Sequence, residues 1–160
     1  MRTTSAAFTI ASLVIAVACG GSDSKGVTNP NQNKSAGTLS ARIDGAVWTA
    51  ALVSVGVNTN GLIIAGSSAS GQGLAIGASR LQGTGAQTFG TNVSALGTLT
   101  LGTQSWSATG LGGSGSSGTV TLTTLTTNRA VGTFAFTATP LAGGATTNRV
   151  VTSGAFDVTF

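Results

Sequence analysis

The segment GTVTLTTLTTNRAVGTFAFTA, residues 118–138, decides the fold class of this chain. Threonine alternates with valine and leucine in its first half, and Phe134 and Phe136 are two positions apart in its second half. A period of two residues places apolar side chains on one face of a strand and polar side chains on the other. The segment therefore predicts two strands, over 118–126 and 129–139, that each bury one face.

The same alternation recurs along most of the chain, and no window of twelve or more residues after position 19 has a helical stripe. Further strands are expected over 38–43, 46–57, 61–68, 73–80, 86–89, 94–101, 104–108 and 148–160. Asp44-Gly45 and Asn60-Gly61 are dipeptides that accept positive φ and close tight hairpins. A longer loop is expected over 110–118. Short strands with such turns predict an all-β domain, either an antiparallel β-sandwich, which we favour, or a small β-barrel.

Large apolar residues on the inward positions of these strands are expected to form a single core that needs no disulfide. The expected core residues are Trp48, Val53, Val55, Leu62, Ile64, Leu74, Ile76, Phe89, Leu99, Leu101, Trp106, Val120, Leu122, Phe134, Phe136, Phe156, Val158 and Phe160. Few charged residues lie along the strand edges, so unpaired edges would be prone to aggregation. Closure of the sheet or pairing with a partner is therefore expected to cover these edges.

Charged residues make up only 6% of the chain, and glutamate and histidine are absent. General acid–base catalysis most often uses histidine, and paired carboxylates would have to come from Asp44 and Asp157. The chain has no histidine and a single cysteine, so it lacks the usual ligands for a transition-metal site. We therefore expect a protein that is not an enzyme and that holds no metal and no cofactor. Its arginines are scattered rather than clustered, which argues against nucleic-acid binding.

The N-terminal residues predict export. A basic start and the apolar run AAFTIASLVIAVA fit a signal peptide over residues 1–18, and the run is too short to span a membrane. Ala16-Val17-Ala18 before Cys19 resembles the lipobox of bacterial lipoproteins, although Ala16 replaces the usual leucine. We expect lipidation at Cys19, a flexible tether over 19–37 and the β-domain over 38–160. Gly20 stands where aspartate marks inner-membrane retention, so an outer-membrane location is expected.

The ends of the domain resemble a family of small bacterial lipoprotein domains of unknown function. SARIDGAVW (40–48) is similar to the family's Ile-Asp-Gly-x-x-Trp opening, and GAFDVTF (154–160) to its Gly-x-Phe-x-Val-x-Phe closing strand. VGTFAFTA (131–138) resembles the penultimate strand of that family. The resemblance implies a β-rich exported domain and supplies no activity.

These observations favour a lipid-anchored envelope domain with a structural or partner-binding role, in which the lipid contacts the membrane and the protein or glycan partner is not identified. One alternative is a carbohydrate-binding module in which exposed Trp48 and Trp106 stack on sugars, although burial of both rings in the core is the more ordinary expectation. Another is a water-ordering surface made by the threonine rows at 98–100 and 119–123, as in some ice-binding proteins.

Overall fold

Antiparallel strands form the whole of the regular structure in the computed structural model, which describes residues 36–89, 95–108 and 116–160. The strands are β1 (Gly37–Ile43), β2 (Ala46–Thr49), β3 (Leu52–Val57), β4 (Gly61–Ser67), β5 (Gly73–Ser79), β6 (Gly85–Thr88), β7 (Ala95–Leu101), β8 (Gln104–Ser107), β9 (Ser117–Leu125), β10 (Arg129–Ala142) and β11 (Arg149–Thr159). The all-β class expected from the alternation is confirmed.

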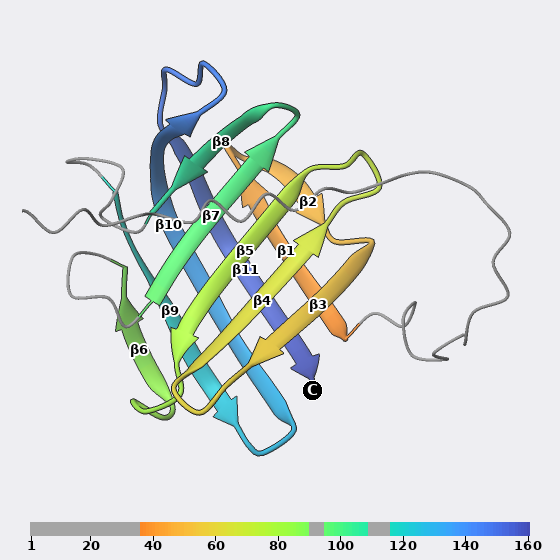
Figure 1. The fold of residues 1–160 in the computed structure, drawn as a ribbon, viewed down its shortest axis with the longest axis vertical. Helices are drawn as coiled ribbons and strands as arrows, with labels where there is room; N and C mark the ends of the chain where they lie inside the picture. The colour runs from red at the N-terminus through yellow and green to blue at the C-terminus, as the bar shows by residue number, and fades with distance from the viewer. Residues whose placement is uncertain (1–35, 90–94, 109–115) are drawn as a thin grey trace, which may run out of the picture. The chain divides into compact units, whose positions relative to one another are not determined.

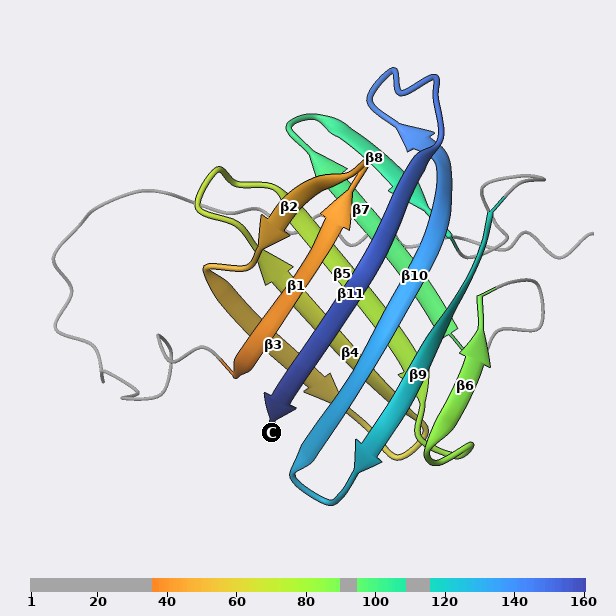
Figure 2. The ribbon, with the colours of Figure 1, turned by 180° about the vertical axis from the view of Figure 1, so that it is seen from behind.

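The strands form two layers that share one long strand, β10 (Figures 1 and 2). Sheet A has the order β2-β1-β11-β10-β9-β6, and sheet B has the order β8-β7-β5-β4-β3. The first part of β10 pairs with β9 and β11, and its end, from Thr139 to Ala142, pairs with β8. The result is one open antiparallel sheet folded over itself, a sandwich that is continuous along one side.

The two layers meet through close contacts at inward-facing glycines of sheet B. A side chain at Gly66 would collide with Leu39 and Trp48 of sheet A, and one at Gly97 would press on the ring of Phe136. Because these glycines carry no side chain, the large residues of sheet A fill the space above them.

Strands β10 and β11 interlock through alternating glycine and phenylalanine. Gly132 lies opposite Phe156, and Phe134 lies opposite Gly154. A side chain at Gly154 would come within 2.5 Å of the Phe134 ring. The rings of Phe134 and Phe156 stack with centroids 6.4 Å apart. Each phenylalanine therefore lies across a bare backbone position of the neighbouring strand, and this pairing fixes the register of the two strands.

A buried glutamine joins β6 of sheet A to β5 of sheet B. Gln87 is 2% exposed, and its side-chain amide mimics a neighbouring strand. Its Oε1 accepts a hydrogen bond from the Ser79 N–H at 2.7 Å, and its Nε2 donates to the Ser79 carbonyl at 2.8 Å. The amide therefore satisfies both backbone groups of the last residue of β5.

The expected core is confirmed, with three residues less buried than the rest. Val55, Leu101 and Phe160 are half-buried and pack against the core cluster, whereas the other expected members are buried. Trp48 and Trp106 are among the buried residues, at 4% and 1% exposure.

Two details of the expected strand pattern are wrong. The segment expected as one strand over 46–57 is two strands, β2 and β3, because the chain passes from sheet A to sheet B at Ala50 and Ala51. The Asn60-Gly61 hairpin forms without positive φ, since the Asn58 side chain closes the turn by accepting hydrogen bonds from the backbone N–H groups of Asn60 and Gly61.

The turn predicted at Asp44-Gly45 is confirmed. Asp44-Gly45 adopts φ of 50° and 85°, as expected for a tight hairpin. Most of the loop expected over 110–118 lies outside the described residues, and β9 begins within it at Ser117.

Candidate functional site

The two tryptophans proposed to stack on sugars lie inside the domain. Trp106 donates from Nε1 to the Thr147 carbonyl at 2.8 Å, and the Arg149 guanidinium covers its ring at 4.9 Å. Trp48 packs under Gly66, with its Nε1 buried and no acceptor within reach among the described residues. Neither ring presents a face to solvent, so the exposed aromatics that the carbohydrate alternative required are missing at these two positions.

The first carboxylate of the domain, Asp44, ties the β1–β2 hairpin to β11. Its Oδ2 accepts a hydrogen bond from Arg149 at 2.7 Å, and its Oδ1 accepts from the Val150 N–H at 2.9 Å. Burial by itself raises the pKa of Asp44. The Val150 N–H and the hydrogen bond and charge of Arg149 outweigh burial, so the pKa lies below its ordinary value. Asp44 is therefore an ionised structural anchor at neutral pH.

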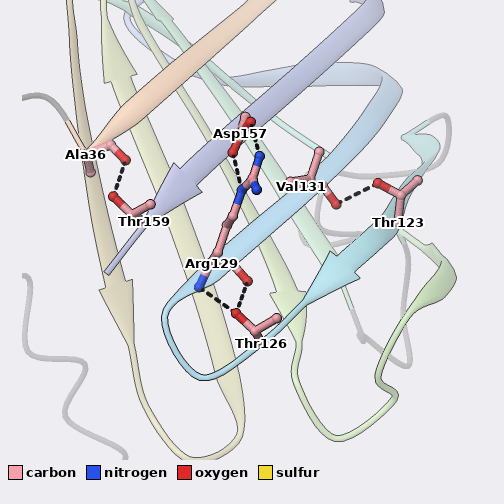
Figure 3. A network of polar contacts seen from close by, with 7 residues as sticks. All are labelled: Ala36, Thr123, Thr126, Arg129, Val131, Asp157 and Thr159. Atoms are coloured by element: carbon pink, nitrogen blue, oxygen red, sulfur yellow. Dashed lines mark hydrogen bonds and ion pairs between the residues drawn. The ribbon is translucent and has the colours of Figure 1, made fainter.

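The second carboxylate, Asp157, lies on β11 beside Arg129 of β10 (Figure 3). Arg129 donates from Nε and from one terminal nitrogen to the two carboxylate oxygens, at 2.9 and 2.7 Å. The hydrogen bond from Arg129 lowers the pKa of Asp157. Thr126 closes the adjacent turn, accepting from the Arg129 N–H and donating to the carbonyl of the same residue.

The two carboxylates are too far apart to act together. Asp44 binds β11 at Val150, and Asp157 is seven residues further along the same extended strand. At about 3.4 Å per residue, this spacing separates them by about 24 Å. Paired carboxylates in glycoside hydrolysis work at about 5–10 Å, so this pair cannot share a substrate bond.

An open apolar groove of about 350 Å³ lies on the outer face of sheet B. Ile63, Gly77 and Leu96 are cross-strand neighbours on β4, β5 and β7, and the Leu96 side chain lies over the bare backbone of Gly77. Leu81 lines the same groove and is 74% exposed, and Ile63 is 49% exposed. Asn58 and Asn60 line one end, and no ionisable side chain lines it.

The described ranges contain no cluster of three or more histidine, cysteine or acidic residues that could ligate a metal ion. They also contain no helix long and apolar enough to cross a membrane. Cys19, the expected lipidation site, and the expected signal peptide lie outside the described residues.

Three features of the structure are not predicted by the sequence analysis. Arg129 and Arg149 were expected only as scattered solubilising charges, yet each pairs with a carboxylate distant in sequence. Gln87 carried no signal, because a single polar residue in a short strand normally faces water. The groove follows from the register of β4, β5 and β7, which local sequence does not specify.

Residues 35–158 match the family described as Domain of unknown function (DUF6252), and the chain belongs to this family. The match agrees with the expected resemblance to a family without an assigned function. No curated protein and no solved structure matches the chain.

Proposed function

We propose that this chain is an exported lipoprotein of the bacterial cell envelope, anchored by acylated Cys19, whose β-domain works by non-catalytic contact with a partner. The N-terminal signal pattern supports the anchor, and the Gly20 position supports the outer membrane. The short motifs at 43–48 and 154–160 support a place among lipoprotein domains of this kind.

The groove on sheet B is the observation on which the contact role depends. It presents Ile63 and Leu81 to solvent beside half-buried Leu96, and no ionisable residue lines it. Apolar side chains gathered around a depression are typical of binding surfaces rather than of reaction centres, which need groups that move protons. Both described carboxylates are meanwhile held as ion-pair partners of arginine.

Contact at the groove is tested with 8-anilinonaphthalene-1-sulfonate, a dye whose fluorescence rises in apolar sites. We expect the wild-type chain to bind the dye, and Leu81→Ser or Ile63→Ser to weaken the binding about three- to ten-fold. Val47→Ser is the matched control, because Val47 is also 74% exposed but lies on β2 of sheet A. Equal loss of binding in the control would show that the dye reports scattered apolar surface and not the groove.

The anchor is tested separately by expressing the full chain in a bacterium supplied with labelled palmitate. The wild-type chain should take up label and sediment with membranes. Cys19→Ser should take up none, because the acylated thiol is gone. Label on the Cys19→Ser chain would contradict acylation at this residue.

A further inference from the structure

A second hollow lies at one end of the domain, apart from the groove residues. It has a volume of about 560 Å³ and is lined by Thr59, Arg80, Leu125, Thr126 and Thr127. These residues come from the β3–β4 turn, the position after β5 and the β9–β10 hairpin. The β3–β4 turn of sheet B and the β9–β10 hairpin of sheet A lie at the same end of the domain (Figure 1).

Arg80 and Arg42 are the two described arginines without a carboxylate partner, and of these two Arg80 also lies against an aromatic ring. Arg129 and Arg149 are bound to carboxylates, and Arg42 donates to the Gly45 carbonyl of its own hairpin. Arg80 makes one long hydrogen bond, at 3.3 Å, to the Asn58 carbonyl and lies 5.7 Å from the centre of the Phe160 ring. A guanidinium has five N–H donors, so most of those on Arg80 have no acceptor among the described residues.

The contacts of Arg80 hold it in place without neutralising it. The Phe160 ring and the Asn58 carbonyl fix the guanidinium at the hollow. The carboxylates of Asp44 and Asp157 are both occupied by other arginines. Arg80 is therefore a positioned cation, half-buried, with donors available for an external acceptor.

The hydroxyl groups around Arg80 are also partly available. Thr126 uses its hydroxyl inside its own turn, bonding to Asn128 and Arg129. Thr59 and Thr127 are exposed, and no hydrogen bond occupies their hydroxyls within the part of the chain that the structure describes. Two hydroxyls and a guanidinium that no carboxylate binds among the described residues make a site that can donate hydrogen bonds to an oxyanion and exchange hydrogen bonds with ligand hydroxyls.

We propose that this hollow binds a carboxylate-bearing saccharide, with Arg80 donating to the carboxylate and Thr59 and Thr127 bonding to ring hydroxyls. Guanidinium and carboxylate match in planar geometry and charge. The hollow is wide open to solvent, so a sugar ring attached to the carboxylate can lie over it without obstruction. Leu125 is the one apolar residue that lines it, so it lacks the apolar surface that lipid chains would require.

The test is a titration of the detergent-solubilised full chain by isothermal calorimetry and ligand-observed NMR. Galacturonate, galactose, acetate and glycerol 3-phosphate are the probes, because they separate the carboxylate from the sugar ring and from a lipid-type phosphate. Galacturonate should bind at least ten-fold more tightly than galactose or acetate, and its affinity should fall as salt is added.

Matched variants locate the binding. Arg80→Gln should weaken galacturonate binding at least ten-fold, whereas Arg42→Gln removes the same charge from the β1–β2 hairpin and should change it less than two-fold. Thr59→Val should weaken it two- to five-fold. Arg80→Lys keeps the charge and should retain part of the binding. Partial binding by Arg80→Lys would show that Arg80→Gln loses binding through the lost contact and not through misfolding.

Several outcomes would overturn the proposal. These are no galacturonate binding by the wild type, equal losses in Arg80→Gln and Arg42→Gln, and acetate or galactose binding as tightly as galacturonate. Glycerol 3-phosphate binding ten-fold more tightly than galacturonate would assign the hollow to a phosphate headgroup instead. Each of these results leaves the dye-binding test of the groove unaffected.

Discussion

Replacement of Gln87 by leucine removes the buried amide that joins β6 to β5. Leucine fills a similar volume but leaves the Ser79 N–H and carbonyl without the partners they have at 2.7 and 2.8 Å. An unsatisfied buried polar group costs about 1–3 kcal/mol. Because Ser79 is half-buried, water can form part of the hydrogen bonding that its N–H and carbonyl lose. We therefore expect Gln87→Leu to lower the free energy of unfolding by about 2–4 kcal/mol in total.

Urea unfolding followed by tryptophan fluorescence measures this loss, since Trp48 and Trp106 are buried and become exposed on unfolding. Gln104→Leu is the control. Gln104 is a half-buried glutamine in β8 whose side chain makes no hydrogen bond to any residue that the structure describes, so its replacement should change the free energy of unfolding by less than about 0.5 kcal/mol. A loss no larger in Gln87→Leu than in Gln104→Leu would refute the role assigned to the amide.

Gln87→Glu adds a pH signature that a packing effect would not give. A buried carboxyl at this position can donate to the Ser79 carbonyl only when protonated, so its pKa in the folded state should lie above the unfolded value of about 4.3. A raised folded pKa means that the hydrogen bond is fully present below the unfolded pKa and is lost as pH rises through the folded pKa. The stability deficit of Gln87→Glu relative to wild type should therefore shrink between pH 7 and pH 4, and a constant deficit would contradict this.

Two further predictions concern β11. Gly154→Ala should lower the free energy of unfolding, measured by urea unfolding, by about 1–3 kcal/mol. The reason is that the added methyl group would come within 2.5 Å of the Phe134 ring. No loss of stability would show that the ring moves freely. Because the folded pKa of Asp44 is lowered, its ion pair stabilises the fold above the unfolded pKa of about 3.9, and this stabilisation is lost as pH falls through the folded value. Asp44→Asn keeps a turn-forming dipeptide and should flatten the acid dependence of the urea midpoint, and an unchanged dependence would contradict the role of the pair.

Local alternation was sufficient to predict most of the strands, because the period of two residues is a property of each strand alone. It could not predict that β10 continues to Ala142 and joins both sheets, since that depends on which strands lie beside it. The break at Ala50 was missed for the same reason, because the apolar pattern runs on while the chain changes sheets.

The candidate sites depended on pairings distant in sequence. Asp44 meets Arg149 across 105 positions, and Ile63 meets Leu96 across Gly77 only once three strands are in register. Arg129 and Arg149 have carboxylate partners, whereas Arg80 has one long hydrogen bond and a ring contact, and the sequence shows only that the arginines are scattered. Burial of Trp48 and Trp106 was expected from their residue type, which favours the core when few aromatics are available.

Anchoring of this β-domain in the envelope is tested most directly by the intact mass of the mature chain purified from membranes. A chain that begins at Cys19 and carries a diacylglyceryl thioether with the mass of its acyl chains is the result we predict. A chain that begins elsewhere, or an unmodified Cys19 in the membrane fraction, would contradict the proposal.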